Sequence, residues 1–451
     1  MFLRNLFCCL LFFVFDGFVY ADSNDIIESG YHLDTIDLSS EYLCLSVDSI
    51  SALSSLDSSL VILDDSLYNV ELPKKLKWVD TKLFYATHIP LSLISLGIIE
   101  KQFDKKTRQL RNDFMPSFHD ETDNYLQLAP VVVLYGMKAA GVKSRSSWSR
   151  MIVSHAATVA FMFPLTRSLK SIFKVQRPDS SKPNSFPSGH TTTAFMTATM
   201  LHKEYGYLSP WVTVGSYSCA TATGLMRMAN NRHWYSDVLC GAGLGMLTTE
   251  FGYWIGDLLF KDKGLNVSDH RHNKFSKYDH PSFLSICNGV NIPINDHFYD
   301  KSGDIFSPTA GQSFGLEGAY YFSPYIGLGA KCCATNIDLA DDYDTTCDNH
   351  VIRYCQVMSG VYGNLPVTDR TSFCSKLLLG HAHFKGLECE NCDIDAFSVI
   401  CANTELGLTY KLDTHFGTRF SLNYNILKSD NVLTEKFIHT LSIGGNIIFH
   451  F

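Results

Sequence analysis

Eight residues between positions 170 and 237 have the side chains that a site for a tetrahedral oxyanion needs. They form three clusters: Lys170 with Arg177; Ser188 with Gly189 and His190; and Arg227 with His233 and Asp237. Guanidinium and ammonium groups bind such an anion, and backbone N–H groups beside a glycine can complete the set. The pattern therefore predicts phosphoryl-transfer chemistry.

The second cluster precedes a segment, residues 191–196, that is typical of the start of a helix. Free N–H groups and the helix dipole at such an N-terminus favour an anion. The expected phosphate-binding residues are Lys170, Arg177, Ser188, Gly189 and Arg227.

Two histidines give the expected site its reactivity. His233 and Asp237 are four residues apart, so they would share one face if this segment is helical. Asp237 could then accept the Nδ1 proton and leave Nε2 of His233 as a nucleophile. His190 would protonate a leaving-group oxygen. The expected catalytic residues are therefore His233, His190 and Asp237.

The order and spacing of the clusters resemble the three-part signature of the type-2 phosphatidic acid phosphatase and vanadium haloperoxidase superfamily. The matching segments are Lys170-x6-Arg177-Pro178, Pro187-Ser188-Gly189-His190 and Arg227-x5-His233-x3-Asp237. The resemblance covers roughly residues 76–260. It implies a six-helix bundle, a phosphohistidine intermediate on His233, His190 as general acid, and no metal or other cofactor. Met226 is a departure, because the family often has serine there, and it affects one auxiliary hydrogen bond.

The beginning of the chain has the composition of a secretory signal peptide, residues 1–21. Arg4 precedes an apolar run, and Val19-Tyr20-Ala21 supplies a small-residue end. The alternative, an uncleaved membrane anchor, is disfavoured by Asp16 and Gly17, which interrupt a run already short for a bilayer. An acidic, Ser/Leu-rich segment follows at residues 22–75, and the pattern assigns it no function.

The net charge of −8 argues against nucleic acid as a partner. Apolar segments predict helices at residues 84–100, 125–141, 148–173, 190–205, 210–226 and 236–260. Most are interrupted by proline or charged residues before they reach about 20 apolar residues, which favours a soluble or membrane-surface bundle. Gly241, Gly243 and Gly245 would let the last helix pack closely behind Asp237.

Residues 101–120 form a charged connection that contains Arg108 and Arg111. It could be a solvated helix end or a rim that selects anionic substrates. Residues 261–280 are polar and are expected to be a linker.

Beyond residue 281 the apolar period falls to two. Leu406, Leu408 and Tyr410 alternate with polar residues, and the apolar residues that begin with Phe420 alternate with polar residues in the same way. Such strands, apolar on one side and polar on the other, predict an outer-membrane-type β-barrel of about eight strands over residues 281–451. The alternative is a water-soluble β-sandwich. The terminal Phe451 resembles the end of bacterial outer-membrane barrels, where it helps the assembly machinery to recognise the chain.

The cysteines of the β region predict loop disulfides whose pairing the sequence does not give; they are Cys332, Cys333, Cys347, Cys355, Cys374, Cys389, Cys392 and Cys401. The spacing His381-x-His383-x5-Cys389-x2-Cys392 also permits a zinc site, which is the weaker hypothesis.

The predicted protein is a multidomain α plus β chain in which the six-helix bundle of residues 76–260 precedes the barrel. The predicted activity is metal-independent hydrolysis of phosphomonoesters or lipid pyrophosphates. The expected partners are a phosphorylated lipid or small phosphoester, a membrane, and the outer-membrane assembly machinery. The expected location is the bacterial outer membrane with the helical domain in the periplasm, and the inner membrane is the alternative. The rival functions are a vanadate-dependent haloperoxidase, and a pore or adhesin with a non-catalytic helical domain.

Overall fold

The computed structural model describes residues 62–63, 66–67, 82–267, 281–299, 305–340, 351–389, 392–394, 396–412, 415–429 and 437–451. The chain divides into two compact units, Met1–Tyr85 and Ala86–Phe451. In the first unit, β1 (Ile62–Leu63) pairs antiparallel with β2 (Ser66–Leu67). The predicted signal peptide, most of the predicted acidic segment and most of the predicted linker lie outside the described residues.

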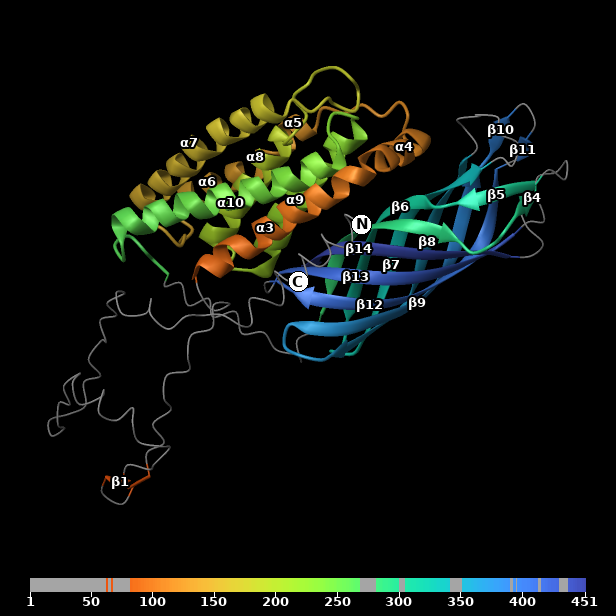
Figure 1. Ribbon diagram of the computed structural model, residues 1–451. Helices are drawn as coiled ribbons and strands as arrows, with labels where there is room; N and C mark the ends of the chain where they lie inside the picture. The colour runs from red at the N-terminus through yellow and green to blue at the C-terminus, as the bar shows by residue number, and fades with distance from the viewer. Residues whose placement is uncertain are drawn as a thin grey trace. The chain divides into compact units, whose positions relative to one another are not determined.

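Helices follow one another from residue 82 to residue 260 (Figure 1). They are α3 (Lys82–Glu100), η3 (Lys101–Phe103), α4 (Asp104–Phe114), α5 (Asp123–Leu126), α6 (Ala129–Ala139), α7 (Trp148–Phe173), α8 (Gly189–Tyr205), α9 (Pro210–Ala229) and α10 (Tyr235–Phe260). The predicted helical class is confirmed for this region. No helix in the described part of the chain has both the length and the hydropathy that crossing a membrane requires.

Two details of the predicted bundle were wrong. The segment 125–141 is not one helix but two, α5 and α6, because Pro130 in the first turn of α6 has no N–H to continue a preceding helix. The charged segment 101–120 is not a simple connection, because it contains α4. Asp104, Thr107 and Leu110 of α4 are buried at a spacing of three, so one face of this charged helix packs against the domain.

Helix α10 packs closely between two neighbours, as its glycines predicted. A Cβ atom at Gly245 would lie 2.3 Å from the carbonyl oxygen of Thr192 in α8. One at Gly243 would lie 2.5 Å from the carbonyl oxygen of Pro90 in α3. Because no side chain fits at these positions, α10 lies against the backbones of both helices, and its N-terminal turn is fixed beside the start of α8.

A buried arginine connects the start of α7 with the end of α10. Arg150, in the first turn of α7, is 1% exposed and donates through Nη1 to the carbonyl oxygens of Lys261 (2.6 Å) and Lys263 (2.9 Å). Its Nη2 donates to the carboxylate of Asp257. Arg150 therefore closes a clamp between the start of α7 and the chain that leaves α10.

Eight antiparallel strands close into a barrel (Figure 1). In sequence order they are β3 (Phe283–Pro293), β6 (Gly311–Tyr321), β7 (Ile326–Ala340), β8 (Val351–Pro366), β9 (Thr371–Lys385), β12 (Phe397–Lys411), β13 (Phe416–Lys428) and β14 (Phe437–His450). Each strand pairs with the next, and β14 pairs with β3 to close the ring. The short strands β4 (Phe298–Tyr299), β5 (Ile305–Thr309), β10 (Leu387–Cys389) and β11 (Cys392–Ile394) extend the strand ends.

The predicted alternation of the strands is confirmed. Leu406 is 70% exposed and its neighbour Glu405 is 2% exposed; Phe420 is 57% exposed and Arg419 is 3% exposed. Apolar side chains therefore cover the outside, as in a barrel that faces lipid. The inside holds polar side chains such as Glu405 and Arg419 together with a buried apolar cluster that includes Phe384, Leu427 and Ile438.

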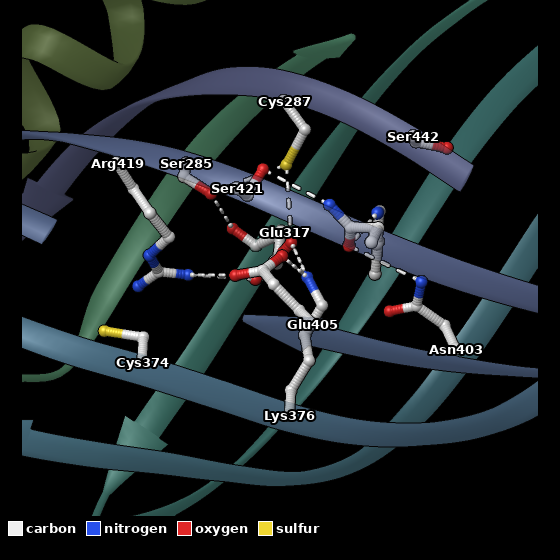
Figure 2. A network of polar contacts seen from close by, with 12 residues as sticks. Ser285, Cys287, Glu317, Cys374, Lys376, Asn403, Glu405, Arg419, Ser421 and Ser442 are labelled. Atoms are coloured by element: carbon white, nitrogen blue, oxygen red, sulfur yellow. Dashed lines mark hydrogen bonds and ion pairs between the residues drawn. The ribbon is translucent and has the colours of Figure 1, made fainter. Parts of the chain in front are cut away.

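Two cations and two carboxylates inside the barrel form ion pairs across the lumen (Figure 2). Lys376 of β9 places Nζ 2.7 Å from Glu317 of β6 and 2.5 Å from Glu405 of β12. Arg419 of β13 places Nη1 3.3 Å and 3.5 Å from the same two carboxylates. This ion quartet joins four strands.

The loop disulfides predicted for the β region are wrong for five of the cysteines. Cys332, Cys333, Cys355, Cys374 and Cys401 are free thiols, because they lie within strands rather than in loops. Cys347 and the side chains of Cys389 and Cys392 lie outside the described residues, and so does half of the hypothetical zinc site.

Candidate active site

The loop between α7 and α8 gathers the first cluster of cations. Lys170, in the last turn of α7, donates through Nζ to the carbonyl oxygens of Asn184 (2.8 Å) and Pro187 (2.6 Å). Arg177 donates through Nε to Oδ1 of Asn184 (2.9 Å). Asn184 therefore holds both cations at the start of the second cluster, a role that no motif indicated.

The second cluster forms the N-terminus of α8, as predicted. Ser188 is the N-cap, and a Cβ atom on Gly189 would lie 3.8 Å from Cε of Lys170. The backbone N–H of Ser188 donates to the carbonyl oxygen of Asp237 (3.1 Å), so it joins α8 to α10 and is not free for an anion. Helix geometry leaves the N–H groups of Gly189 and His190 without an intrahelical acceptor, and these can serve the anion instead.

His233 and Asp237 do not share a helical turn, which corrects the prediction. Trp234 is the N-cap of α10, and its backbone N–H donates to Oδ2 of Asp237 (3.0 Å), so the helix begins after His233. Nδ1 of His233 lies 3.7 Å from Oδ2 of Asp237, which is too long for a hydrogen bond.

Ser185 bridges this gap, and sequence reasoning missed it. Its hydroxyl donates to Oδ2 of Asp237 and lies 3.4 Å from Nδ1 of His233. Ser185 is fully buried and its backbone N–H is bonded to Val175, so its position is fixed. His233, Ser185 and Asp237 thus form a buried line of polar contacts that runs from Nδ1 of the imidazole through the hydroxyl to the carboxylate.

Arg227 brings the third cation to the site from the last turn of α9. Its Nη1 donates to Oδ2 of Asp123 (2.8 Å), whereas its Nε is buried and has no partner among the described residues. A buried donor without an acceptor is costly in a folded protein, and it is expected where a ligand supplies the acceptor. The Nε–H of Arg227 is therefore suited to an anion.

The pKa values of the basic groups in the pocket are lowered by burial and by their mutual repulsion. Burial lowers the pKa of His233 to about 4, against the opposing effect of Asp237. Burial, aided by Arg227, lowers the pKa of His190 to about 4. Burial also lowers the pKa of Lys170 to about 8, with Arg177 and Arg227 acting in the same direction. The pocket thus holds excess positive charge and two neutral imidazoles at neutral pH.

Helix α4 supplies two further arginines next to His233. A small hollow of about 20 Å³ is lined by His233, Trp234, Arg108 and Arg111, among others. Arg111 is used structurally, since its Nε donates to the carbonyl oxygen of Ala229 (2.7 Å). Arg108 donates through Nε to Asn231 (3.3 Å) and lies over the Trp234 ring, so it is the better candidate for the predicted anion-selecting rim.

The Ser185 bridge predicts the effect of removing one hydroxyl. Ser185→Ala is expected to lower kcat roughly 10- to 100-fold, because small misplacements of a reacting group have effects of this size. KM should change little, since Ser185 does not contact the cations through its side chain. Steady-state kinetics of the full chain measure both constants. Ser181→Ala, in the same loop but exposed, is the matched control, and an unchanged kcat in Ser185→Ala would contradict the bridge.

A family model matches the part of the chain that contains this site, and a curated relative matches about half of the chain. The model of the PAP2 superfamily matches residues 147–260, which contain all eight predicted site residues. Residues 147–260 form a PAP2 superfamily domain. The lipid A 1-phosphatase of Porphyromonas gingivalis is 46% identical to this chain over 238 residues, which are 52% of either protein. The chain thus spans about half the length of this curated relative.

Solved structures similar to parts of the chain include a transmembrane phosphatase and a bacterial surface protein. A PAP2-type phosphatidylglycerolphosphate phosphatase from Bacillus subtilis is 19% identical, covering 39% of this chain and all of that one, at a TM-score of 0.27. LpxE from Aquifex aeolicus is 22% identical, and the match covers 32% of this chain and 92% of that one at a TM-score of 0.24. Neisserial surface protein A is 10% identical, and the match covers 39% of this chain and 98% of that one at a TM-score of 0.27.

Proposed function

We propose that the PAP2 domain is a metal-independent phosphohydrolase that acts on a phosphorylated lipid through a phosphohistidine intermediate. The observation that carries the proposal is the convergence of Lys170, Arg177 and Arg227 around two imidazoles, with a buried Nε–H of Arg227 that lacks an acceptor within the described structure. The name of the 46% identical relative, a lipid A 1-phosphatase, supports a lipid phosphate as substrate.

The proposed reaction has two displacements at phosphorus. Nε2 of His233 forms a bond to phosphorus, the bond to the ester oxygen breaks, and its electron pair goes to that oxygen, which takes a proton from His190. A water molecule then gives a proton to His190 and attacks phosphorus, and the bond to His233 breaks. Lys170, Arg177, Arg227 and the amides at the start of α8 stabilise the charge on the three equatorial oxygens.

The charged form of His190 that this step needs arises upon binding. In the free site the pKa of His190 is about 4, so the ring is neutral at pH 7. A bound phosphate group places negative charge beside the ring, which favours the imidazolium and raises the pKa. Substrate binding therefore favours the protonated form of His190, which can act as the general acid.

The lowered pKa values predict the limbs of the pH profile. We expect kcat/KM to fall below pH 4, where His233 gains a proton and loses its nucleophilic lone pair. Above pH 4 the free protein must take up the proton of His190 when substrate binds, so kcat/KM should decline gradually with rising pH. It should decline more steeply above pH 8, where Lys170 loses its charge and binds the anion less well. In Lys170→Arg the alkaline limb should move to higher pH, because a guanidinium does not titrate there. An alkaline limb that stays in place would assign it to another group.

The experiment that tests the function is phosphate release by the purified full chain. The panel should contain lipid A, phosphatidic acid, phosphatidylglycerol phosphate, undecaprenyl pyrophosphate and a soluble monoester, with and without a chelator. We expect release in the presence of chelator and inhibition by vanadate, which resembles the pentacoordinate state. Oxidation of halide by the vanadate-loaded protein with peroxide would instead indicate the haloperoxidase.

We also propose that the barrel anchors the enzyme in the bacterial outer membrane with the helical domain in the periplasm. The support is the apolar outer surface of the strands, such as Leu406 and Phe420, around an interior that contains buried charges such as Glu405 and Arg419. Fractionation of inner from outer membranes tests this location, and recovery with the inner membrane would contradict it.

A further inference from the structure

A four-residue helix outside the matched family segment contacts two of the three motif clusters. Asp123 of α5 pairs with Arg227 at 2.8 Å, and its neighbour Asn124 accepts a hydrogen bond through Oδ1 from Nε2 of His190 at 2.9 Å. The matched segment begins at residue 147, so α5 does not belong to it. Adjacent residues of one element thus reach the proposed general acid and a phosphate-binding arginine.

The position of α5 is fixed by the helix that carries Arg227. Asn230, the C-cap of α9, accepts from the backbone N–H of Asp120 (2.9 Å) and donates to its carbonyl oxygen (2.7 Å). Asp123 is 1% exposed, so its pairing with Arg227 is shielded from water. These contacts attach the turn before α5 and its first residue to the end of α9.

Within the pocket, α5 lies on the side of His190. Asp123 opposes the lowering of the pKa of His190, whereas Asp237 opposes it for Lys170 and both Asp179 and Asp237 oppose it for Arg177. Asp123 binds Nη1 of Arg227, and Nε of the same guanidinium has no partner among the described residues, so this N–H stays available to a phosphate. Asn124 is exposed, so its contact with His190 lies at the solvent-facing edge of the site. Because the proposed role of His190 is to protonate the leaving group, that group would lie at this edge.

An amide oxygen can only accept, so the contact with Asn124 requires a proton on Nε2 of His190. We infer that Asn124 is a positioning residue for His190: it holds the imidazole so that the protonated Nε2 faces the leaving-group side. In the reaction, the leaving oxygen takes over this N–H from the amide oxygen of Asn124. The inference rests on the proposed function and adds to it a residue that selects for poor leaving groups.

The test compares two phosphate monoesters with the full chain, one with an aryl leaving group (p-nitrophenyl phosphate) and one with an alkyl leaving group (octyl phosphate). An aryl oxide departs without a proton, whereas an alkoxide needs one. Asn124→Ala should lower kcat/KM for the alkyl ester about tenfold relative to the aryl ester. Tyr125→Ala, an exposed change on the same helix, should leave this ratio unchanged. An unchanged ratio in Asn124→Ala overturns the inference.

A second measurement separates this inference from the proposed function. Nitrogen-15 shifts of the His190 ring report which nitrogen carries the proton, without any turnover. We expect the Nε2–H form in the parent chain and a mixture of tautomers in Asn124→Ala. If the parent hydrolyses neither of these esters and none of the lipids of the panel, the proposed function fails, and the positioning role is then decided by these shifts. The same tautomer in both proteins would refute it.

Discussion

Replacing His233 by alanine is expected to lower turnover roughly 10⁴- to 10⁶-fold and to abolish the phosphoenzyme, because loss of a nucleophile removes the covalent route altogether. His233 is 3% exposed and lies close to Lys170 and Arg227, so neither water nor another described side chain would readily replace it. Rapid-quench labelling with a phosphorus-32 substrate measures the intermediate, and phosphate release measures turnover.

The matched control is His119→Ala, which removes an exposed imidazole of the same domain. It should retain parental rates. Circular dichroism of both variants shows whether the bundle is folded. Residual labelling of a folded His233→Ala protein would mean that another residue accepts the phosphoryl group, and the mechanism would have to be rebuilt around that residue.

The second large effect is expected in the barrel. Lys376→Met should lower the free energy of unfolding by about 3–5 kcal/mol, the usual cost of breaking a buried ion pair from one side. The substitution leaves Glu317 and Glu405, which are 3% and 2% exposed, with Arg419 as their remaining partner in the quartet. Urea unfolding of the full chain in detergent micelles measures the change.

A double variant distinguishes unpaired charge from lost packing. Lys376→Met with Glu405→Gln removes one charge of each sign and leaves the Glu317–Arg419 pair intact. It should recover most of the stability that the single variant loses, because no carboxylate then lacks a partner. If single and double variants are equally unstable, the packing of the Lys376 side chain, and not its charge, supports the barrel.

The sequence was sufficient to predict the parts of the molecule that follow a short-range rule. The alternation of Leu406 with Glu405 and of Phe420 with Arg419 predicted which side chains face outward, because side chains on a strand alternate. The glycines of α10 predicted its close packing with α8. The spacing of three motifs predicted that Lys170, Gly189 and Arg227 lie near one another, while their part in binding phosphate stays a prediction.

Other features depend on contacts that no local pattern reveals. Ser185 and Asn124 belong to no motif, and they act only because the fold places them beside His233 and His190. The predicted start of α10, Ser236, is one residue from the observed start, but the contact between His233 and Asp237 was misjudged because Asp237 caps the helix instead of bonding directly to His233. Helix α4 was missed since its buried face includes Asp104 and Thr107, which are not apolar.

The Arg150 clamp has a mechanical consequence. Tension applied to the chain after Lys263 is borne by the carbonyl oxygens of Lys261 and Lys263 and passes to the first turn of α7. The opposite end of α10, with Asp237, is 20 or more residues away along a stiff rod. Thermal motion of the chain that follows the helical domain is thus resisted at the Arg150 contacts, far from the candidate active site. The domain can therefore be tethered without displacement of its site residues.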